Sequence, residues 1–274
     1  MIIYRSRFIK NKSKNSQARV TRKVRKQKMK INDGIESVDN KVYSILMIGQ
    51  SNMSGRGDFG EVEKIDNPNC FMLRMGRWQP MREPVNADRY VLIEDGDFHS
   101  GVSLAASLAD DMAKDTGKKI GLIPCADGGT SLNQWMPGEI LFDHAVMQAS
   151  LAMRTSELVA IVWHQGESDA RRLELINTYK DRFITMISAM REQLGVDVPV
   201  ILGEIAYEIN PRYDVPTEHS KLINDVFFEI TKELPRSAVA SSKGLSMKRD
   251  GIHFDSAGAR EFGHRYYAKL KELL

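Results

Sequence analysis

Cysteines and long apolar runs are scarce in this chain, and each absence removes a class of protein. Only two cysteines, Cys70 and Cys125, occur among 274 residues. That is far below the density of a secreted scaffold held by disulfides, so both are predicted to be reduced thiols. The apolar start of the chain is broken at Arg5, and no later run approaches the length of a membrane span. We therefore expect a soluble, cytoplasmic protein without a membrane partner.

The residue patterns of metal hydrolases are also missing. The six histidines include no His-Glu-x-x-His or comparable pairing, so the sequence predicts no metal site, and it implies no other cofactor. The Gly-x-Ser-x-Gly elbow of α/β-hydrolases is absent as well, which argues against that serine-hydrolase fold. A hydrolase built on this chain must use other residues.

Acidic residues are absent from the first 30 positions, which carry twelve lysines or arginines. The rest of the chain holds 27 basic residues against 36 acidic ones, so the body is acidic although the formal net charge is +3. This distribution argues against a body built to hold nucleic acid, and no specific nucleic-acid partner is expected. Residues 1–40 have the composition of a basic, disordered extension, either inert or a tether to phosphates. Residues 41–274 are predicted to form one catalytic domain.

From residue 41 onward, short apolar runs alternate with longer segments of helical period, which is typical of an α/β fold. Apolar stripes at four-residue spacing predict helices that cover a sheet. We therefore predict a three-layer α/β/α sandwich around a parallel sheet of about five strands. The predicted strands are 42–48, 119–124, 158–163, 198–203 and 237–240, and the stripes are Leu104 with Leu108 and Met112, Tyr179 with Phe183, and Phe262 with Tyr266 and Leu270.

Residues that can carry chemistry collect directly after four of these strands. In a parallel sheet, ligands bind beyond the carboxyl ends of the strands, so these segments are expected to meet at one edge. The four blocks are Gly-Gln-Ser-Asn-Met at 49–53, Asp-Gly-Gly-Thr-Ser at 127–131, His-Gln-Gly-Glu-Ser-Asp at 164–169 and Asp-Gly-Ile-His-Phe at 250–254.

A serine nucleophile needs an adjacent base, and the base needs an acid that fixes its tautomer. Asp250 and His253 stand three residues apart, so on one helical turn the carboxylate can reach the ring nitrogen that does not face Ser51. The reaction also needs hydrogen-bond donors for the oxyanion. Candidate donors are the amide of Ser51, the backbone of Gly128 or Gly129, and the side chain of Gln165.

Further side chains in or near these blocks are candidate substrate contacts. Trp135 can either stack on a sugar face or pack in the core behind the oxyanion glycines, and Arg56 and Asp169 can meet hydroxyls or a carboxylate. The predicted substrate-binding set is Gln50, Arg56, Trp135 and Asp169.

Taken together, the four blocks closely resemble the SGNH/GDSL hydrolase superfamily. Within it they look like the branch of sialate O-acetylesterases and carbohydrate esterase family 6, which includes acetylxylan esterase-like enzymes. The resemblance covers about residues 43–263. It implies a flavodoxin-like sandwich, removal of acetyl groups from sialic acid or xylo-oligosaccharides, and no metal.

Carried over by position, the resemblance implies that Ser51 is the nucleophile, His253 the general base and Asp250 its acidic partner. Gln165 stands where the wider superfamily has an asparagine at the oxyanion position. Glu167 is a second candidate for orienting the histidine, and sequence spacing does not choose between the two carboxylates.

Two other functions compete with this interpretation. A thioesterase or lysophospholipase on the same fold would need a long apolar channel instead of a polar cleft. A catalytically silent carbohydrate-binding protein would not need the serine, base, acid and oxyanion candidates that are all present here.

Overall fold

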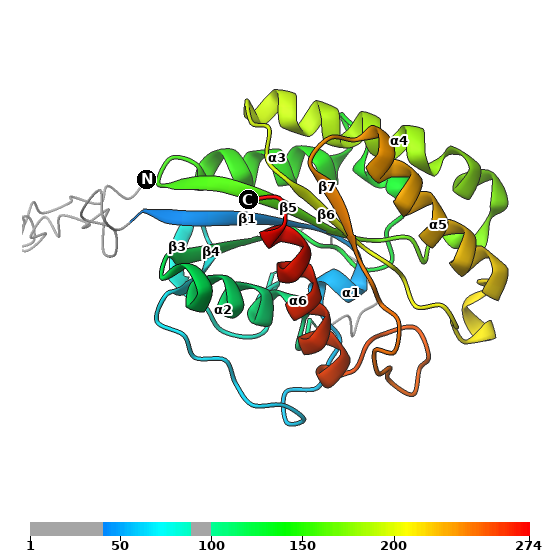
Figure 1. Cartoon of the computed structure of the whole chain (residues 1–274), viewed down its shortest axis with the longest axis horizontal. Helices are drawn as coiled ribbons and strands as arrows, with labels where there is room; N and C mark the ends of the chain where they lie inside the picture. The colour runs from blue at the N-terminus through cyan, green and yellow to red at the C-terminus, as the bar shows by residue number, and fades with distance from the viewer. Residues whose placement is uncertain (1–40, 89–99) are drawn as a thin grey trace, which may run out of the picture. The chain divides into compact units, whose positions relative to one another are not determined.

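A computed structural model describes residues 41–88 and 100–274 (Figure 1). The predicted basic extension 1–40 lies outside the described residues. Within them, no helix is long and apolar enough to cross a membrane.

The centre of the fold is a seven-stranded sheet in the order β3-β2-β4-β1-β5-β6-β7. Every neighbouring pair is parallel except the β2–β3 hairpin at the edge, which is antiparallel. The strands are β1 (Val42–Gly49), β2 (Cys70–Arg74), β3 (Arg77–Pro80), β4 (Lys119–Pro124), β5 (Ser156–His164), β6 (Val200–Gly203) and β7 (Ser237–Ala240).

All five predicted strands are present, as β1, β4, β5, β6 and β7, but the predicted number was too low by two. The two strands that were not predicted form the β2–β3 hairpin. Both strands are short, and β3 is exposed or half-buried along its whole length, so it lacks the continuous apolar run of a central strand. β2 has an apolar run of only four residues, 70–73, which the sequence prediction missed. Their two-residue turn is made by Met75 and Gly76, both at positive φ, and Met-Gly lacks the Asn-Gly or Asp-Gly signature of such turns.

Helices cover both faces of the sheet and complete the predicted three layers. Figure 1 shows α2 and α6 on one face and α3, α4 and α5 on the other, and contacts join α2 to α6, α3 to α4, and α4 to α5. The residues of the three predicted stripes are all buried in these helices. The helices are α1 (Ser51–Ser54), α2 (Leu104–Thr116), α3 (Ile140–Ala152), α4 (Leu173–Leu194), α5 (Thr217–Glu233) and α6 (Ser256–Lys271), with the short 3-10 helices η2 (Leu132–Trp135), η3 (Asp169–Arg171) and η4 (Pro211–Tyr213).

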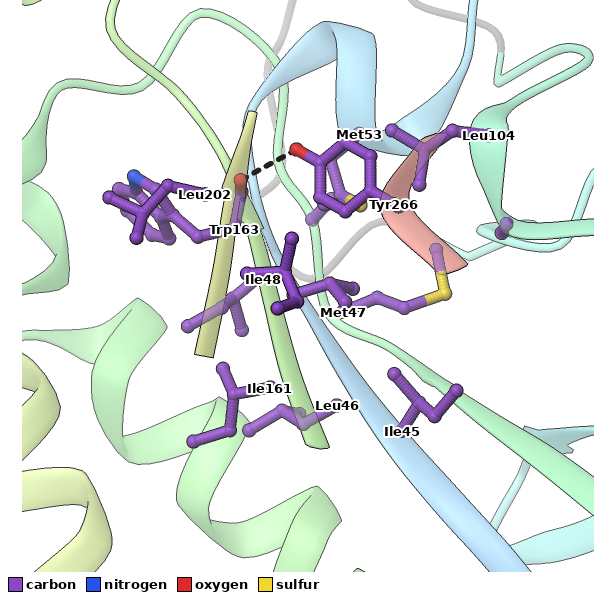
Figure 2. Close-up of a cluster of buried hydrophobic side chains, with 14 of the residues drawn as sticks. Ile45, Leu46, Met47, Ile48, Met53, Leu104, Ile161, Trp163, Leu202 and Tyr266 are labelled. Atoms are coloured by element: carbon purple, nitrogen blue, oxygen red, sulfur yellow. Dashed lines mark hydrogen bonds between the residues drawn. The ribbon is translucent and has the colours of Figure 1, made fainter. Parts of the chain in front are cut away.

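Strand β1 runs through the middle of the core (Figure 2). Successive side chains of a strand point to opposite faces, and residues 45–48 are all buried because both faces are covered by helices. Across the sheet, the hydroxyl of Tyr266 in α6 donates to the Trp163 carbonyl of β5 over 2.8 Å. This bond fixes α6 against the carboxyl end of β5.

The strand order also fixes where a site can form. The strands β2, β3 and β4 lie on one side of β1, and β5, β6 and β7 lie on the other. In a sheet of this topology the strand order reverses between β1 and β5, and ligands bind in the crevice at the carboxyl ends of these two strands. Gly49 ends β1 beside His164, the last residue of β5. Gly49 has φ 133°, and a Cβ there would lie 2.2 Å from the His164 carbonyl oxygen. Only glycine allows the chain to leave β1 so close to β5.

Candidate active site

Ser51 is held rigidly at this crevice. It is the first residue of the single-turn helix α1, which follows β1 after one residue. Its carbonyl accepts hydrogen bonds from the Gly55 amide over 2.9 Å and from the Ser54 hydroxyl over 3.0 Å. The residue is only 6% exposed. Its backbone is fixed by these hydrogen bonds, which sets the position of its hydroxyl.

The structure brings Ser51, His253 and Asp250 together in one hydrogen-bonded chain. The Oγ of Ser51 lies 3.0 Å from Nε2 of His253, and Nδ1 of the same ring lies 2.8 Å from Oδ2 of Asp250. An Nδ1–H directed at the carboxylate leaves Nε2 as the acceptor for the serine proton. The three side chains therefore have the geometry of an activated serine nucleophile.

Asp250 is fixed by its own loop. Its Oδ1 accepts the backbone N–H groups of Ile252 and His253, each over 3.0 Å. Burial raises the pKa of the Asp250 carboxyl, but the amides of Ile252 and His253 together with the His253 ring outweigh it and the net pKa is lowered. The carboxylate is therefore ionised at neutral pH and can stabilise a protonated imidazole.

Glu167, the other predicted partner of His253, is bound elsewhere. It is 1% exposed, accepts from Nδ2 of Asn52 over 2.6 Å, and has Oε1 3.4 Å from Nε2 of His164. Burial raises the pKa of Glu167, but the His164 ring and the Asn52 amide outweigh it, and the net pKa is lowered. Of the two carboxylates, Asp250 is the one that contacts His253.

Asn52 connects Glu167 to the segment that carries the base, and sequence reasoning did not single it out. Its Nδ2 also donates to the Ile252 carbonyl over 3.1 Å, while its Oδ1 accepts the Phe254 amide over 3.1 Å. The side chain thus brackets His253 from both sides. Its position directly after the nucleophile was the only signal in the sequence.

The predicted role of the Gln165 side chain as an oxyanion donor is wrong for this geometry. The residue is 0% exposed, and its Nε2 faces three acceptors: Oε1 of Gln50 at 3.1 Å, the Thr130 carbonyl at 3.1 Å and Oδ2 of Asp169 at 2.7 Å. Its Oε1 accepts from the Tyr179 hydroxyl over 2.8 Å. With both amide hydrogens directed at these acceptors, the side chain has none left for a substrate.

Two predicted substrate contacts are also wrong. Asp169 is 0% exposed, and it accepts from the Leu132 amide over 2.8 Å and pairs with Arg182 at 3.0 Å. Trp135 is likewise 0% exposed and packs edge-on against Trp163 with ring centroids 5.5 Å apart. Of the two interpretations of Trp135, core packing is the correct one. Both side chains are buried and contact residues of the site blocks, Asp169 through Gln165 and Trp135 through Thr130.

Gln50 and Arg56 lie beside the nucleophile. Gln50 precedes Ser51, is 2% exposed, and is tied to Gln165 through its Oε1. Arg56 is half-buried and donates from Nη1 to the Ser54 hydroxyl over 2.5 Å and to the Gly55 carbonyl over 2.8 Å. Both stay candidate substrate contacts by position.

The backbone around Ser51 supplies the oxyanion candidates. Within the part of the chain that is described, the Ser51 amide donates to no protein acceptor, as is usual for the first residues of a helix. A Cβ added at Gly128 would lie 3.6 Å from the Ser51 Cβ and 2.5 Å from Nη2 of Arg56, whereas one at Gly129 would meet open space. Gly128 is therefore the glycine that borders the nucleophile.

The described residues include no metal-binding cluster and no reactive thiol. Across residues 41–88 and 100–274, no three histidine, cysteine or acidic side chains are grouped so as to hold a metal ion. Cys70 and Cys125 are free and buried, and burial raises the pKa of the Cys70 thiol to about 12. Thiols of this kind stay protonated at neutral pH and are inert.

Comparison with known proteins points in the same direction as the geometry. The model of a family described as carbohydrate esterase, sialic acid-specific acetylesterase, matches residues 40–272. The chain is 26% identical over 238 residues to a protein of Arabidopsis thaliana named as a probable carbohydrate esterase, covering 80% of this chain and 86% of that one.

Solved structures share the fold. The structure of an Arabidopsis thaliana protein aligns with a TM-score of 0.74 at 24% identity, covering 86% of this chain and all of that one (100%). NanS aligns with a TM-score of 0.68 at 15% identity, covering 86% and 98% of the two chains. A carbohydrate acetylesterase from Xanthomonas citri aligns with a TM-score of 0.62 at 17% identity over 85% of this chain and 56% of that one. The predicted SGNH hydrolase fold is confirmed.

Proposed function

Because this chain belongs to the sialic acid-specific acetylesterase family of carbohydrate esterases, we propose that it removes acetyl groups from sugars through an acetyl-enzyme formed on Ser51. Membership makes the chain a carboxylic ester hydrolase that acts on acetylated carbohydrates. The observation that carries the mechanism is the hydrogen-bonded chain from Ser51 through His253 to Asp250.

The first half of the reaction transfers the acetyl group to the enzyme. The Oγ of Ser51 attacks the acetyl carbonyl carbon while Nε2 of His253 takes the serine proton. The oxyanion forms beside the Ser51 amide, whose N–H has no protein acceptor among the described residues. When the intermediate collapses, the bond between the acetyl carbon and the sugar oxygen breaks, and His253 returns the proton to that oxygen.

The second half releases acetate. A water molecule attacks the acetyl carbon and gives its proton to Nε2 of His253, and the bond to Ser51 Oγ then breaks as the serine recovers its proton. Asp250 stays ionised throughout. Its carboxylate stabilises the imidazolium in both steps and is itself held by two backbone amides.

The function is tested by acetate release from O-acetylated sialic acid and acetylated xylo-oligosaccharides, alongside p-nitrophenyl esters of increasing chain length, with a chelator present. We expect release of acetate, a preference for acetyl over longer chains, and no effect of the chelator. A preference for long chains favours a thioesterase or lysophospholipase. Release of nothing from any ester favours a silent binding protein.

A further inference from the structure

A polar cavity lies between the segments that follow β5 and β6, at the end of the sheet where the triad lies. It has a volume of about 350 Å³ and is lined by Arg171, Arg172, Arg212, Tyr213 and Asp214. Arg171 and Arg172 come from the connection between β5 and α4, and the other three from the connection between β6 and α5. We refer to it as the arginine pocket.

The segment that bears Arg212 is hydrogen-bonded to the loop that carries the base. The amide of Asn210, two residues before Arg212, donates to the Gly251 carbonyl over 2.8 Å, and Gly251 lies between Asp250 and His253 in the sequence. In Figure 1 the segment after β6 and the segment after β7 emerge at the same end of the sheet. Followed along the backbone through this hydrogen bond, the Cα atoms of Arg212 and His253 are at most about 20 Å apart.

The two sides of the pocket are also tied to each other. Nδ1 of His219, in the first turn of α5, lies 2.8 Å from the Ala170 carbonyl in η3. Asp214 is held at the end of η4 by a bond from its amide to the Pro211 carbonyl over 3.0 Å. The segments that bear the arginines are therefore fixed before any ligand binds.

The pocket carries uncompensated positive charge. Arg171 and Arg172 are exposed, and neither side chain bonds to any residue in the described part of the chain. Arg212 lies over the ring of Tyr213, 4.8 Å from its centroid, and donates to its hydroxyl over 2.7 Å. Three guanidinium groups thus face one carboxylate, that of Asp214.

Four arginines elsewhere in the described chain pair with carboxylates: Arg74 with Asp88, Arg182 with Asp169, Arg260 with Glu83 and Arg265 with Glu261. In the arginine pocket, three guanidinium groups share one cavity. Like charges held close together repel, and an anion placed among them removes that cost. Guanidinium groups match the planar geometry of a carboxylate, which they bind through paired N–H groups.

We propose that the arginine pocket binds the carboxylate of a sugar acid within the acetylated substrate and so selects acidic over neutral saccharides. This inference rests on the proposed function, because the ester bond that is cleaved must sit at Ser51 while the acidic group reaches the pocket. The carboxylate can belong to a sialic acid or to a uronic acid, since both present the same group.

The test compares each substrate with its own uncharged analogue. The substrates are an O-acetylated sialic acid and an O-acetylated uronic acid oligosaccharide, each as the free acid and as the carboxamide. We expect wild type to show a higher kcat/KM for the acid of at least one pair by about 10-fold to 100-fold, the range of a charged hydrogen-bonded contact. Which pair shows it identifies the source of the carboxylate.

The variants are Arg171→Gln and Arg212→Gln, with Arg154→Gln as the matched control. Arg154 is exposed and lies just before β5, at the opposite edge of the sheet, so its replacement removes one positive charge away from the site. We expect the ratio of kcat/KM for acid over carboxamide to fall toward one in the pocket variants and to keep its wild-type value in the control. An unchanged ratio in the pocket variants, or an equal fall in the control, overturns the inference.

Calorimetric binding of the deacetylated sugar acids separates this inference from the proposed function. Binding of an acid by wild type that is lost in Arg171→Gln and Arg212→Gln supports the pocket even if no acetate is released, in which case the proposed function fails alone. Turnover of acid and carboxamide at equal rates by wild type overturns the pocket and leaves the esterase intact.

Discussion

Asn52 and Glu167 form a buried pair beneath the triad, with Nδ2 of Asn52 donating to Oε1 of Glu167 over 2.6 Å. The remaining groups of Asn52 bind the backbone on both sides of His253. A charged acceptor strengthens the bond and fixes the amide orientation. Glu167 therefore acts on the base through Asn52 and not by direct contact.

Replacing Asn52 by alanine should lower kcat and destabilise the protein by about 1–3 kcal/mol, because buried amide and carboxylate groups lose their partners. Asn224→Ala is the matched control, since Asn224 brackets Ile205 through the same two kinds of bond. Kinetics and urea unfolding of both variants decide the point. If the two variants lose stability and kcat in equal proportion, Asn52 has no special effect on His253.

Replacing Asp250 by asparagine should lower kcat by about 10⁴-fold, the loss measured for the equivalent change in a serine protease triad. Glu167→Gln should cost far less, because Glu167 does not contact the ring. The measurement is kcat at neutral pH for both variants. A larger loss for Glu167→Gln than for Asp250→Asn would reverse the assignment of the acid.

Glu167 should stabilise the fold in a pH-dependent way. Its pKa is lowered from 4.5 in the folded protein, so its ionised form contributes stability that is complete above that value. The contribution is lost as pH falls below 4.5 toward the folded pKa. Urea midpoints of wild type and Glu167→Gln should therefore differ more at about pH 7 than at about pH 4. A difference that widens on acidification contradicts the lowered pKa.

Trp135 should matter for stability and not for sugar binding. Trp135→Phe removes the bond from Nε1 to the Thr130 hydroxyl, which spans 3.1 Å, and leaves a space in the core, so we expect a cost of about 1–3 kcal/mol. KM for acetylated sugars should stay within about twofold of wild type, because a buried Trp135 makes no contact with the sugar. Loss of a contact to the bound sugar would instead raise KM. A large rise in KM at unchanged stability would restore the stacking role.

Most of the fold and the triad could be predicted from the sequence. Continuous apolar runs marked the five buried parallel strands because both of their faces are covered. The order of the blocks placed Ser51, Asp250 and His253 at one edge because carboxyl ends of parallel strands meet there. The hairpin β2–β3 was not predicted because β3 is a short, polar edge strand and the apolar run of β2 has only four residues.

The polar side chains around the triad could not be assigned in the same way. Gln165 and Asp169 sit in a block that bears site residues, but their exposure is set by Tyr179, Arg182 and Leu132, which lie far from the block or on other elements. Sequence shows which polar groups are near the site. It does not show which of them are already satisfied by buried partners.

The central claim is that Ser51 is the nucleophile, and the most direct test is the kcat of Ser51→Ala for acetate release, with mass spectrometry of wild type quenched during turnover. We predict a loss of about 10⁶-fold in kcat, the scale found for the nucleophile of a serine protease. Quenched wild type should carry one added acetyl group on the peptide that contains Ser51, and Ser51→Ala should carry none. Turnover by Ser51→Ala near the wild-type rate, or acetyl found on another residue, would contradict the account.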